Sequence, residues 1–129
     1  MFPKPSRRRK VATERSPEVK AYMDAVAGLG CLACRKLGMT GVPARLHHPR
    51  DSVGLSERGS DMEVYGLCPA HHVGHLQPLD FLSVHGNSRA FHAYFGTDEE
   101  LSRWARELAI RSPYGSDKKF LLAIEKHSL

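Results

Sequence analysis

Two short motifs place metal-binding side chains at the same spacing. Cys31-x-x-Cys34 and Cys68-x-x-His71 each hold two ligands three residues apart, and together they supply three thiolates and one imidazole. Each pair can reach one ion from a single turn, and a Cys₃His set is a common tetrahedral zinc site. Since structural zinc contributes directly to folding, it suits a small core rich in loops. Buried apolar cysteines or a redox pair are the alternatives, but neither explains the repeated spacing.

Further histidines surround these motifs. His47 and His48 are adjacent, and His72 and His75 follow the second motif. Neighbours on a helix point about 100° apart, so His71 and His72 are predicted to serve different sites. We therefore predict an open second metal site that uses His72, one histidine of the 47–48 pair and, as a further ligand, His75. On a strand the pair would face opposite sides, so one imidazole could bind metal while the other acts as a base. Surface histidines beside a proline are the alternative.

The elements that must position these side chains are short. Ser16 and Pro17 are typical of a helix start, and glycines end that helix at residue 28. Glycine and proline then break the chain up to residue 67, and a polar loop at 49–61 separates two predicted strands. In chain order we predict a helix at 16–28, strands at 44–48 and 63–67, and helices at 87–95, from 97 to at least 108 and at about 117–126.

The positive charge lies at the N-terminus. The first 20 residues hold seven Lys or Arg and two Glu, which accounts for the whole formal net charge of +5 of the 129-residue chain. We predict a disordered basic arm at 1–15, either a solvated tail or a segment that seeks phosphate. Residues 16–129 are predicted to form one domain, with a metal core at about 31–76 and C-terminal helices at about 87–127. The candidate nucleic-acid contacts are Arg7, Arg8, Arg9, Lys10, Arg45 and Arg50.

Composition excludes several classes of protein. The longest uncharged apolar stretch, at 26–33, is far shorter than the roughly 18 residues of a membrane span. No apolar run follows the basic residues of the N-terminus, so we expect no secretory signal peptide. Three cysteines cannot all pair, which favours a reduced cytosolic setting in which cysteines more often bind metal.

The order of the motifs resembles that of the HNH, or ββα-metal, endonucleases. The likeness rests on Cys31-x-x-Cys34, on Leu-His-His-Pro at 46–49 and on Leu-Cys-Pro-Ala-His-His-x-x-His at 67–75. It implies an α+β fold with a small zinc-stabilised, treble-clef-like ββα-metal core and flanking helices. Within that superfamily the chain most resembles the phage recombination enhancement function (Ref) nucleases, which combine a basic disordered arm with a His-rich nuclease domain. Phe-His-Ala-Tyr-Phe-Gly at 91–96, before an acidic helix, adds to this likeness.

The resemblance implies a role for each histidine. His48 corresponds to the general base that takes a proton from the attacking water. His47 and His72 correspond to ligands of the catalytic metal, and His75 to a third ligand or a phosphate contact. The Asn of the family name has no counterpart between the histidine pair and the second Cys motif. A backbone carbonyl, or Asp61 in its place, could orient the base.

The leading hypothesis is therefore a metal-dependent DNA endonuclease that hydrolyses phosphodiester bonds with a histidine base. Its cofactors would be a structural zinc and a second divalent metal (Zn, Mn, Ni, Co or Mg), of which Mg²⁺ suits imidazole ligands least. The alternative is a zinc-binding nucleic-acid module without catalysis, which needs only the Cys₃His site and the arm. The Ref resemblance adds a RecA-type filament as a partner, with the arm docking onto it, and the cytoplasm of a bacterium or phage-infected host as the location.

Overall fold

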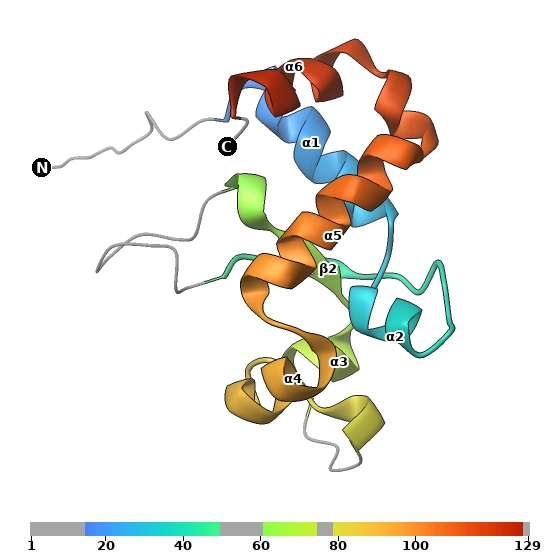
Figure 1. Cartoon of the computed structure of the whole chain (residues 1–129), viewed down its shortest axis with the longest axis vertical. Helices are drawn as coiled ribbons and strands as arrows, with labels where there is room; N and C mark the ends of the chain where they lie inside the picture. Colours follow the sequence, from blue (N-terminus) through green and yellow to red (C-terminus); the bar gives the residue numbers. More distant parts are fainter. Residues whose placement is uncertain (1–14, 50–60, 75–78, 128–129) are drawn as a thin grey trace, which may run out of the picture.

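A computed structural model describes residues 15–49, 61–74 and 79–127 (Figure 1). Helices surround one short two-stranded sheet in these residues, so the predicted α+β class is confirmed. The predicted arm lies outside the described residues except for Arg15. The elements in chain order are α1 (Pro17–Gly28), α2 (Leu32–Lys36), β1 (Arg45–His47), the 3₁₀ turn η2 (Asp61–Glu63), β2 (Tyr65–Leu67), α3 (Pro69–Val73), η3 (Leu79–Phe81), α4 (Ser88–Phe95), α5 (Asp98–Arg111), η4 (Pro113–Ser116) and α6 (Lys118–Lys126).

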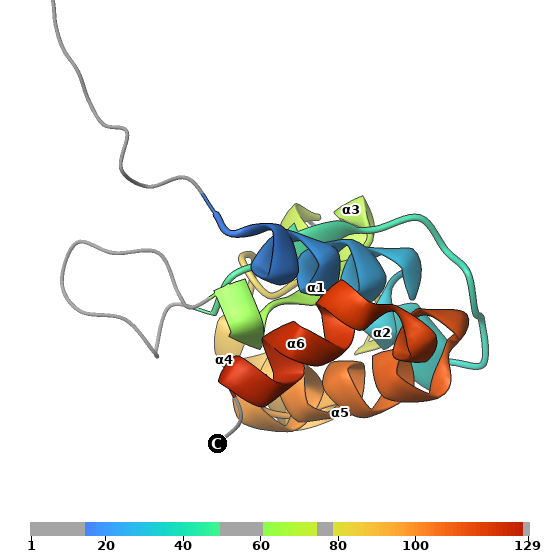
Figure 2. The same cartoon turned by 90° about the horizontal axis from the view of Figure 1, so that it is seen from above.

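Helix α1 begins and ends where the sequence predicts. The hydroxyl of Ser16 accepts a hydrogen bond from the backbone N–H of Val19, and Pro17 occupies the first helical position. The buried face of α1 packs against α6, where the rings of Tyr22 and Phe120 stack with their centroids 5.7 Å apart. Figure 1 shows these two helices together at one end of the molecule, and Figure 2 shows them side by side from above that end. The C-terminal helix therefore completes the core around the first helix.

The sheet is shorter than the predicted strands. Strands β1 and β2 pair antiparallel, with His47 opposite Tyr65, and each has three residues. Glu63, predicted as the first residue of the second strand, ends the 3₁₀ turn η2 instead. A Cβ atom on Gly66 would lie 2.7 Å from the carbonyl oxygen of Gly30, so β2 packs directly against the segment between α1 and α2. Glycine at position 66 permits this close approach, which brings the two Cys motifs together.

The C-terminal third is helical, as predicted. Asn87 caps α4, Gly96 follows it with a φ of +123°, and Thr97 and Glu100 form a complete capping box at the start of α5. Helix α5 passes in front of β2 and joins the α4 end of the molecule to the α1–α6 end (Figure 1). None of the helices in the described residues is long and apolar enough to cross a membrane.

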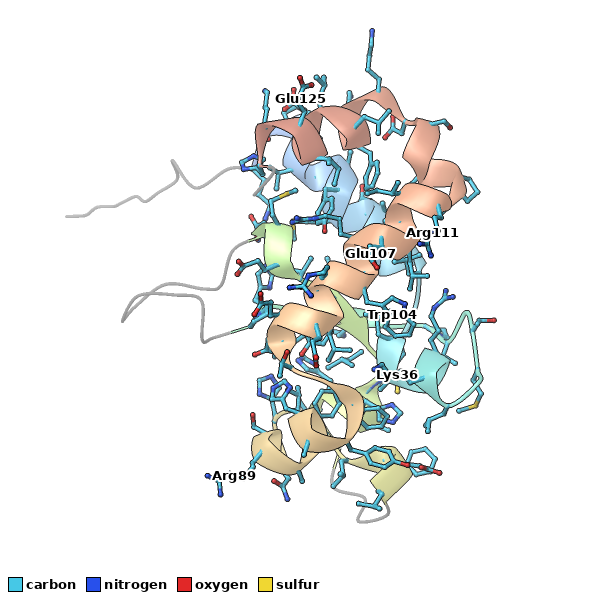
Figure 3. All side chains as sticks on the ribbon, in the orientation of Figure 1. Lys36, Arg89, Trp104, Glu107, Arg111 and Glu125 are labelled. Carbon is cyan, nitrogen blue, oxygen red and sulfur yellow. The ribbon has the colours of Figure 1, made fainter. Side chains whose placement is uncertain are left out.

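The aromatic residues of the C-terminal third belong mostly to the packing. Phe91 and Phe95 are buried in the core. Trp104 of α5 is half-buried, and Nζ of Lys36 lies 5.4 Å from the centroid of its ring (Figure 3). Tyr94 differs, because its side chain is exposed and donates its hydroxyl hydrogen to Oδ1 of Asp80 at 2.7 Å.

Candidate active site

The two Cys motifs meet in one buried cluster. Cys31 precedes α2, and its sulfur accepts a hydrogen bond from the backbone N–H of Cys34 at 3.3 Å. Cys68 precedes α3, where Pro69 occupies the first position and His71 points inward. All four ligand side chains are buried, and their ligand atoms lie within 4.8 Å of one another. The cluster therefore joins segments that are more than 30 residues apart in the chain.

The spacing inside the cluster fits a tetrahedral zinc ion. Nδ1 of His71 lies 3.6, 3.6 and 3.3 Å from the three sulfur atoms in chain order, and the sulfurs of Cys34 and Cys68 are 3.8 Å apart. Zn–S bonds of about 2.3 Å and Zn–N bonds of about 2.0 Å would place tetrahedral ligands about 3.8 Å (S to S) and about 3.5 Å (S to N) apart. These four residues can hold a metal such as zinc.

The surroundings of the cluster also fit a metal. Nε2–H of His71 donates to the backbone carbonyl oxygen of Asp80 at 2.6 Å, which leaves the Nδ1 lone pair directed at the sulfurs. Burial, together with the neighbouring thiols of Cys31 and Cys68, raises the pKa of Cys34. A bound cation would supply the positive charge needed to keep such buried thiolates ionised.

A second cluster contains three imidazoles. His47 ends β1, His72 lies on α3, and His85 lies in the turn between η3 and α4. Nε2 of His72 and Nε2 of His85 are 3.1 Å apart, and the ring centroid of His47 lies 5.3 and 5.2 Å from those of His72 and His85. The site runs from the buried His47 to the exposed His85, so it opens to solvent. Three nitrogen ligands with an open side can hold a divalent ion and leave room for a substrate.

His85 is a candidate ligand that the sequence analysis did not identify. The backbone N–H groups of Val84 and His85 donate to the carbonyl oxygens of His71 and His72, at 2.8 and 3.0 Å. These two hydrogen bonds attach residues 84–85 to α3. The His85 ring therefore lies next to the His72 ring. The spacing of His85 in the sequence carries no signal for this arrangement. His75, the predicted further ligand, lies outside the described residues.

Two imidazoles of the second cluster, those of His47 and His72, favour the neutral form. Burial, with smaller contributions from the nearby His72 and His85, lowers the pKa of His47 to about 3. Burial and the charges of His85 and Arg45 lower the pKa of His72. A neutral imidazole has a free lone pair, and this is the form that binds metal.

His71 and His72 belong to different clusters, as the helix geometry predicts.

His48 lies beside its partner in sequence but faces a different group. Its Nε2–H donates to Oδ1 of Asp61 in η2 at 2.8 Å, and both side chains are about one-fifth exposed. Oδ2 of the same carboxylate accepts from Nε of Arg15 at 2.8 Å. Asp61, which the sequence analysis considered as a group that could orient the base, therefore contacts His48 directly.

The comparison with protein families decides which family the chain belongs to. The family model described as "Recombination enhancement, RecA-dependent nuclease" matches residues 15–110, well over half of the chain. The chain belongs to this family. No curated protein matches the chain. The matched range contains both clusters and the His48–Asp61 pair, and the family's description implies a nucleic-acid substrate and the involvement of RecA.

For a RecA-dependent nuclease, cations near the two clusters are of interest as phosphate contacts. Arg45 is exposed on β1, and its charge contributes to the lowered pKa of His72. Its place is therefore compatible with the predicted phosphate contact. The other cations proposed from the sequence lie outside the described residues, namely Arg7, Arg8, Arg9, Lys10 and Arg50.

Proposed function

We propose that the chain is a metal-dependent DNA endonuclease of the HNH type, with His48 as its general base. The proposal rests on the position of His48 beside a carboxylate and next in sequence to a residue of the second cluster. The imidazole hydrogen-bonds to a carboxylate while its neighbour in sequence, His47, belongs to an open cluster of three imidazoles. The short antiparallel strands between two metal-binding motifs, followed by α3, support a treble-clef-like ββα arrangement.

The hydrogen bond to Asp61 determines which nitrogen of His48 can react. Because a carboxylate only accepts hydrogen bonds, Nε2 carries the proton. In the neutral ring the lone pair then lies on Nδ1, which can take a proton from the attacking water. The negative charge of Asp61 also stabilises the imidazolium that forms.

The three imidazoles of the second cluster would hold the catalytic metal. A divalent ion there would act as a Lewis acid for the charge that develops on the leaving oxygen. Neutral nitrogen ligands suit Zn²⁺, Mn²⁺, Ni²⁺ or Co²⁺ better than the hard cation Mg²⁺. His47 would anchor the site from inside, and His72 and His85 would flank the side from which the phosphodiester approaches. Arg45 would contact a neighbouring phosphate.

Cleavage assays test the role of His48. Wild-type protein and the His48→Ala variant are incubated with single- and double-stranded DNA, with and without a RecA filament, in each divalent ion. Loss of a general base is expected to lower the rate by about 10²- to 10⁴-fold. The matched control is His127→Ala, which removes an exposed histidine after α6. Equal cleavage by wild type and His48→Ala would refute the assignment.

Metal content separates this proposal from a non-catalytic zinc-binding module. Two metal ions per chain and nicking of DNA are expected of the nuclease. One zinc per chain, no second ion and no nicking under any condition would favour the binding module, for which the second cluster is incidental.

The N-terminal segment is proposed to bring the nuclease domain to DNA coated by the filament. Residues 1–14 contain five Lys or Arg, which would bind phosphate in a salt-sensitive manner without sequence preference. Deletion of these residues leaves Arg15 and the Ser16 cap of α1 intact. We expect the deletion to weaken filament-dependent cleavage most at moderate salt. Unchanged cleavage with and without the filament would exclude this role.

A further inference from the structure

The carboxylate of Asp61 has two partners that come from different parts of the chain. His48 donates to Oδ1 and Arg15 donates to Oδ2, each at 2.8 Å. Arg15 lies two residues before α1, and 46 residues separate it from Asp61. Its side chain is 31% exposed and that of Asp61 is 20% exposed, so the pair is partly shielded from water. Among the described residues, Asp61 is the hydrogen-bond partner of the Arg15 guanidinium.

This arrangement restricts how the carboxylate can turn. With one oxygen bound to His48 alone, the Asp61 side chain could rotate and still keep that bond or exchange it with water. A donor on each oxygen fixes the plane of the carboxylate, and with it the direction of the hydrogen bond to the imidazole. The rotamer of Asp61 therefore depends on Arg15.

The backbone under Asp61 has a separate support. Nη2 of Arg106 in α5 donates to the carbonyl oxygen of Met62 at 3.0 Å, and its guanidinium lies 5.7 Å from the ring centroid of Tyr22. This contact attaches η2 to the α1–α5 core. Arg106 thus fixes the backbone of η2. Arg15 donates to the side chain of Asp61 instead, so its contribution is to orient that carboxylate.

We propose that Arg15 is a positioning residue for the nuclease reaction, because it holds Asp61 in the orientation that directs His48. The proposal rests on the proposed function of His48 as the base. The charges agree with it, since burial raises the pKa of Asp61 but hydrogen bonds from Arg15 and His48 outweigh this and lower it. Arg15 thus helps to keep Asp61 an anion that can only accept a hydrogen bond.

Two other roles for Arg15 give different results in an experiment. A partly exposed ion pair without a catalytic role would contribute only about 0–1 kcal/mol to stability and nothing to the rate. A direct contact with the phosphate of DNA would act on binding and would be independent of Asp61. A positioning role acts on the rate through Asp61 alone.

A double-mutant cycle distinguishes these roles. The rate constant kcat and KM are measured on single-stranded DNA in a RecA filament for wild type, Arg15→Ala, Asp61→Asn and the double variant. Loss of a residue that orients a catalytic group is expected to lower kcat by about 10- to 100-fold. KM is expected to change by less than about twofold, and Arg15→Ala to cost less than about twofold in the Asp61→Asn background. Arg15→Lys keeps the charge and should recover part of the rate.

The matched control is Arg103→Ala, which removes another arginine that pairs with an acidic residue, Glu99, at 3.0 Å on the exposed side of α5. Its kcat should equal that of wild type. Thermal unfolding of each variant checks that folding is intact, with midpoints expected within a few degrees of wild type. A raised KM with unchanged kcat, or effects of Arg15→Ala and Asp61→Asn that multiply, would overturn the proposal.

Comparison of the two variants also distinguishes an incorrect role for Arg15 from an incorrect role for His48. If His48→Ala loses activity while Arg15→Ala keeps the full kcat, His48 remains the base and Arg15 has no positioning role. If His48→Ala cleaves as fast as wild type, both assignments are wrong.

Discussion

Replacement of Cys34 by Ser is expected to remove the metal from the buried Cys₃His cluster and unfold the part of the chain around it. The sulfur of Cys34 is 3.8 Å from that of Cys68 and 3.6 Å from Nδ1 of His71, so it contacts both ligands of the other motif. A hydroxyl there would be a poor ligand for zinc. The remaining ligands are fully or nearly fully buried, so water cannot replace the lost sulfur without opening the core.

The expected size of the effect follows from what the cluster holds together. It joins the start of α2 to the end of β2 and to α3, which are separated by more than 30 residues of chain. Structural zinc in small domains contributes about 10–16 kcal/mol of binding free energy. The free energy of unfolding of a domain is typically about 5–15 kcal/mol. Loss of the metal is therefore expected to remove most of the stability of this core.

The assay combines metal analysis with unfolding. The zinc-to-protein ratio is measured for purified wild type and Cys34→Ser, and thermal unfolding is followed by circular dichroism with and without excess chelator. The matched control is Leu32→Ala in the same helix, where a fully buried apolar side chain is lost. That variant should lose about 2–5 kcal/mol of stability and keep its zinc. Wild-type protein without zinc, whose midpoint does not change in chelator, would refute the reasoning.

Three further predictions concern single side chains. His85→Ala should lower the metal content by one ion per chain without loss of the buried zinc, and His127→Ala should leave it unchanged. Phe120→Ala removes the ring that stacks on Tyr22 and should destabilise the fold by about 3–5 kcal/mol in denaturant unfolding, although position 120 lies beyond the family match. Thr97→Ala breaks the capping box of α5 and should cost about 1 kcal/mol, seen as a lower unfolding midpoint with unchanged metal content.

Local patterns predicted the parts of the site that depend on local geometry. A Cys-x-x-Cys or Cys-x-x-His pair comes together within one turn, so each half of the cluster could be identified without the fold. The separation of His71 from His72 follows from the rotation of about 100° between neighbours on a helix. The caps of α1 and α5 were predictable for the same reason, since Ser16 and Thr97 bond to backbone groups three residues away.

The contacts that the sequence did not predict depend on tertiary structure. His85 reaches the second cluster because backbone hydrogen bonds attach residues 84–85 to α3, and no spacing in the sequence signals this. Arg15 was assigned to the basic arm by its neighbours in sequence, yet it pairs with Asp61 across 46 residues. The strands were predicted too long because Ala44 and His48 lie outside the ladder and Glu63 belongs to η2, while Val64 is buried without pairing in β2.

Through helix α3, the proposed second metal site depends on the buried one, whereas the buried one does not depend on the second. It has only five residues, too few to be stable alone, and it carries one ligand of each cluster on adjacent positions, His71 and His72. Its carbonyl groups also hold the segment that delivers His85. If the Cys₃His metal is lost, α3 loses its anchor, and the second cluster should lose two of its three ligands with it. Loss of His85 leaves the buried cluster and its helix untouched. We therefore expect Cys34→Ser to bind neither metal and His85→Ala to keep one, an asymmetry that two independent sites would not produce.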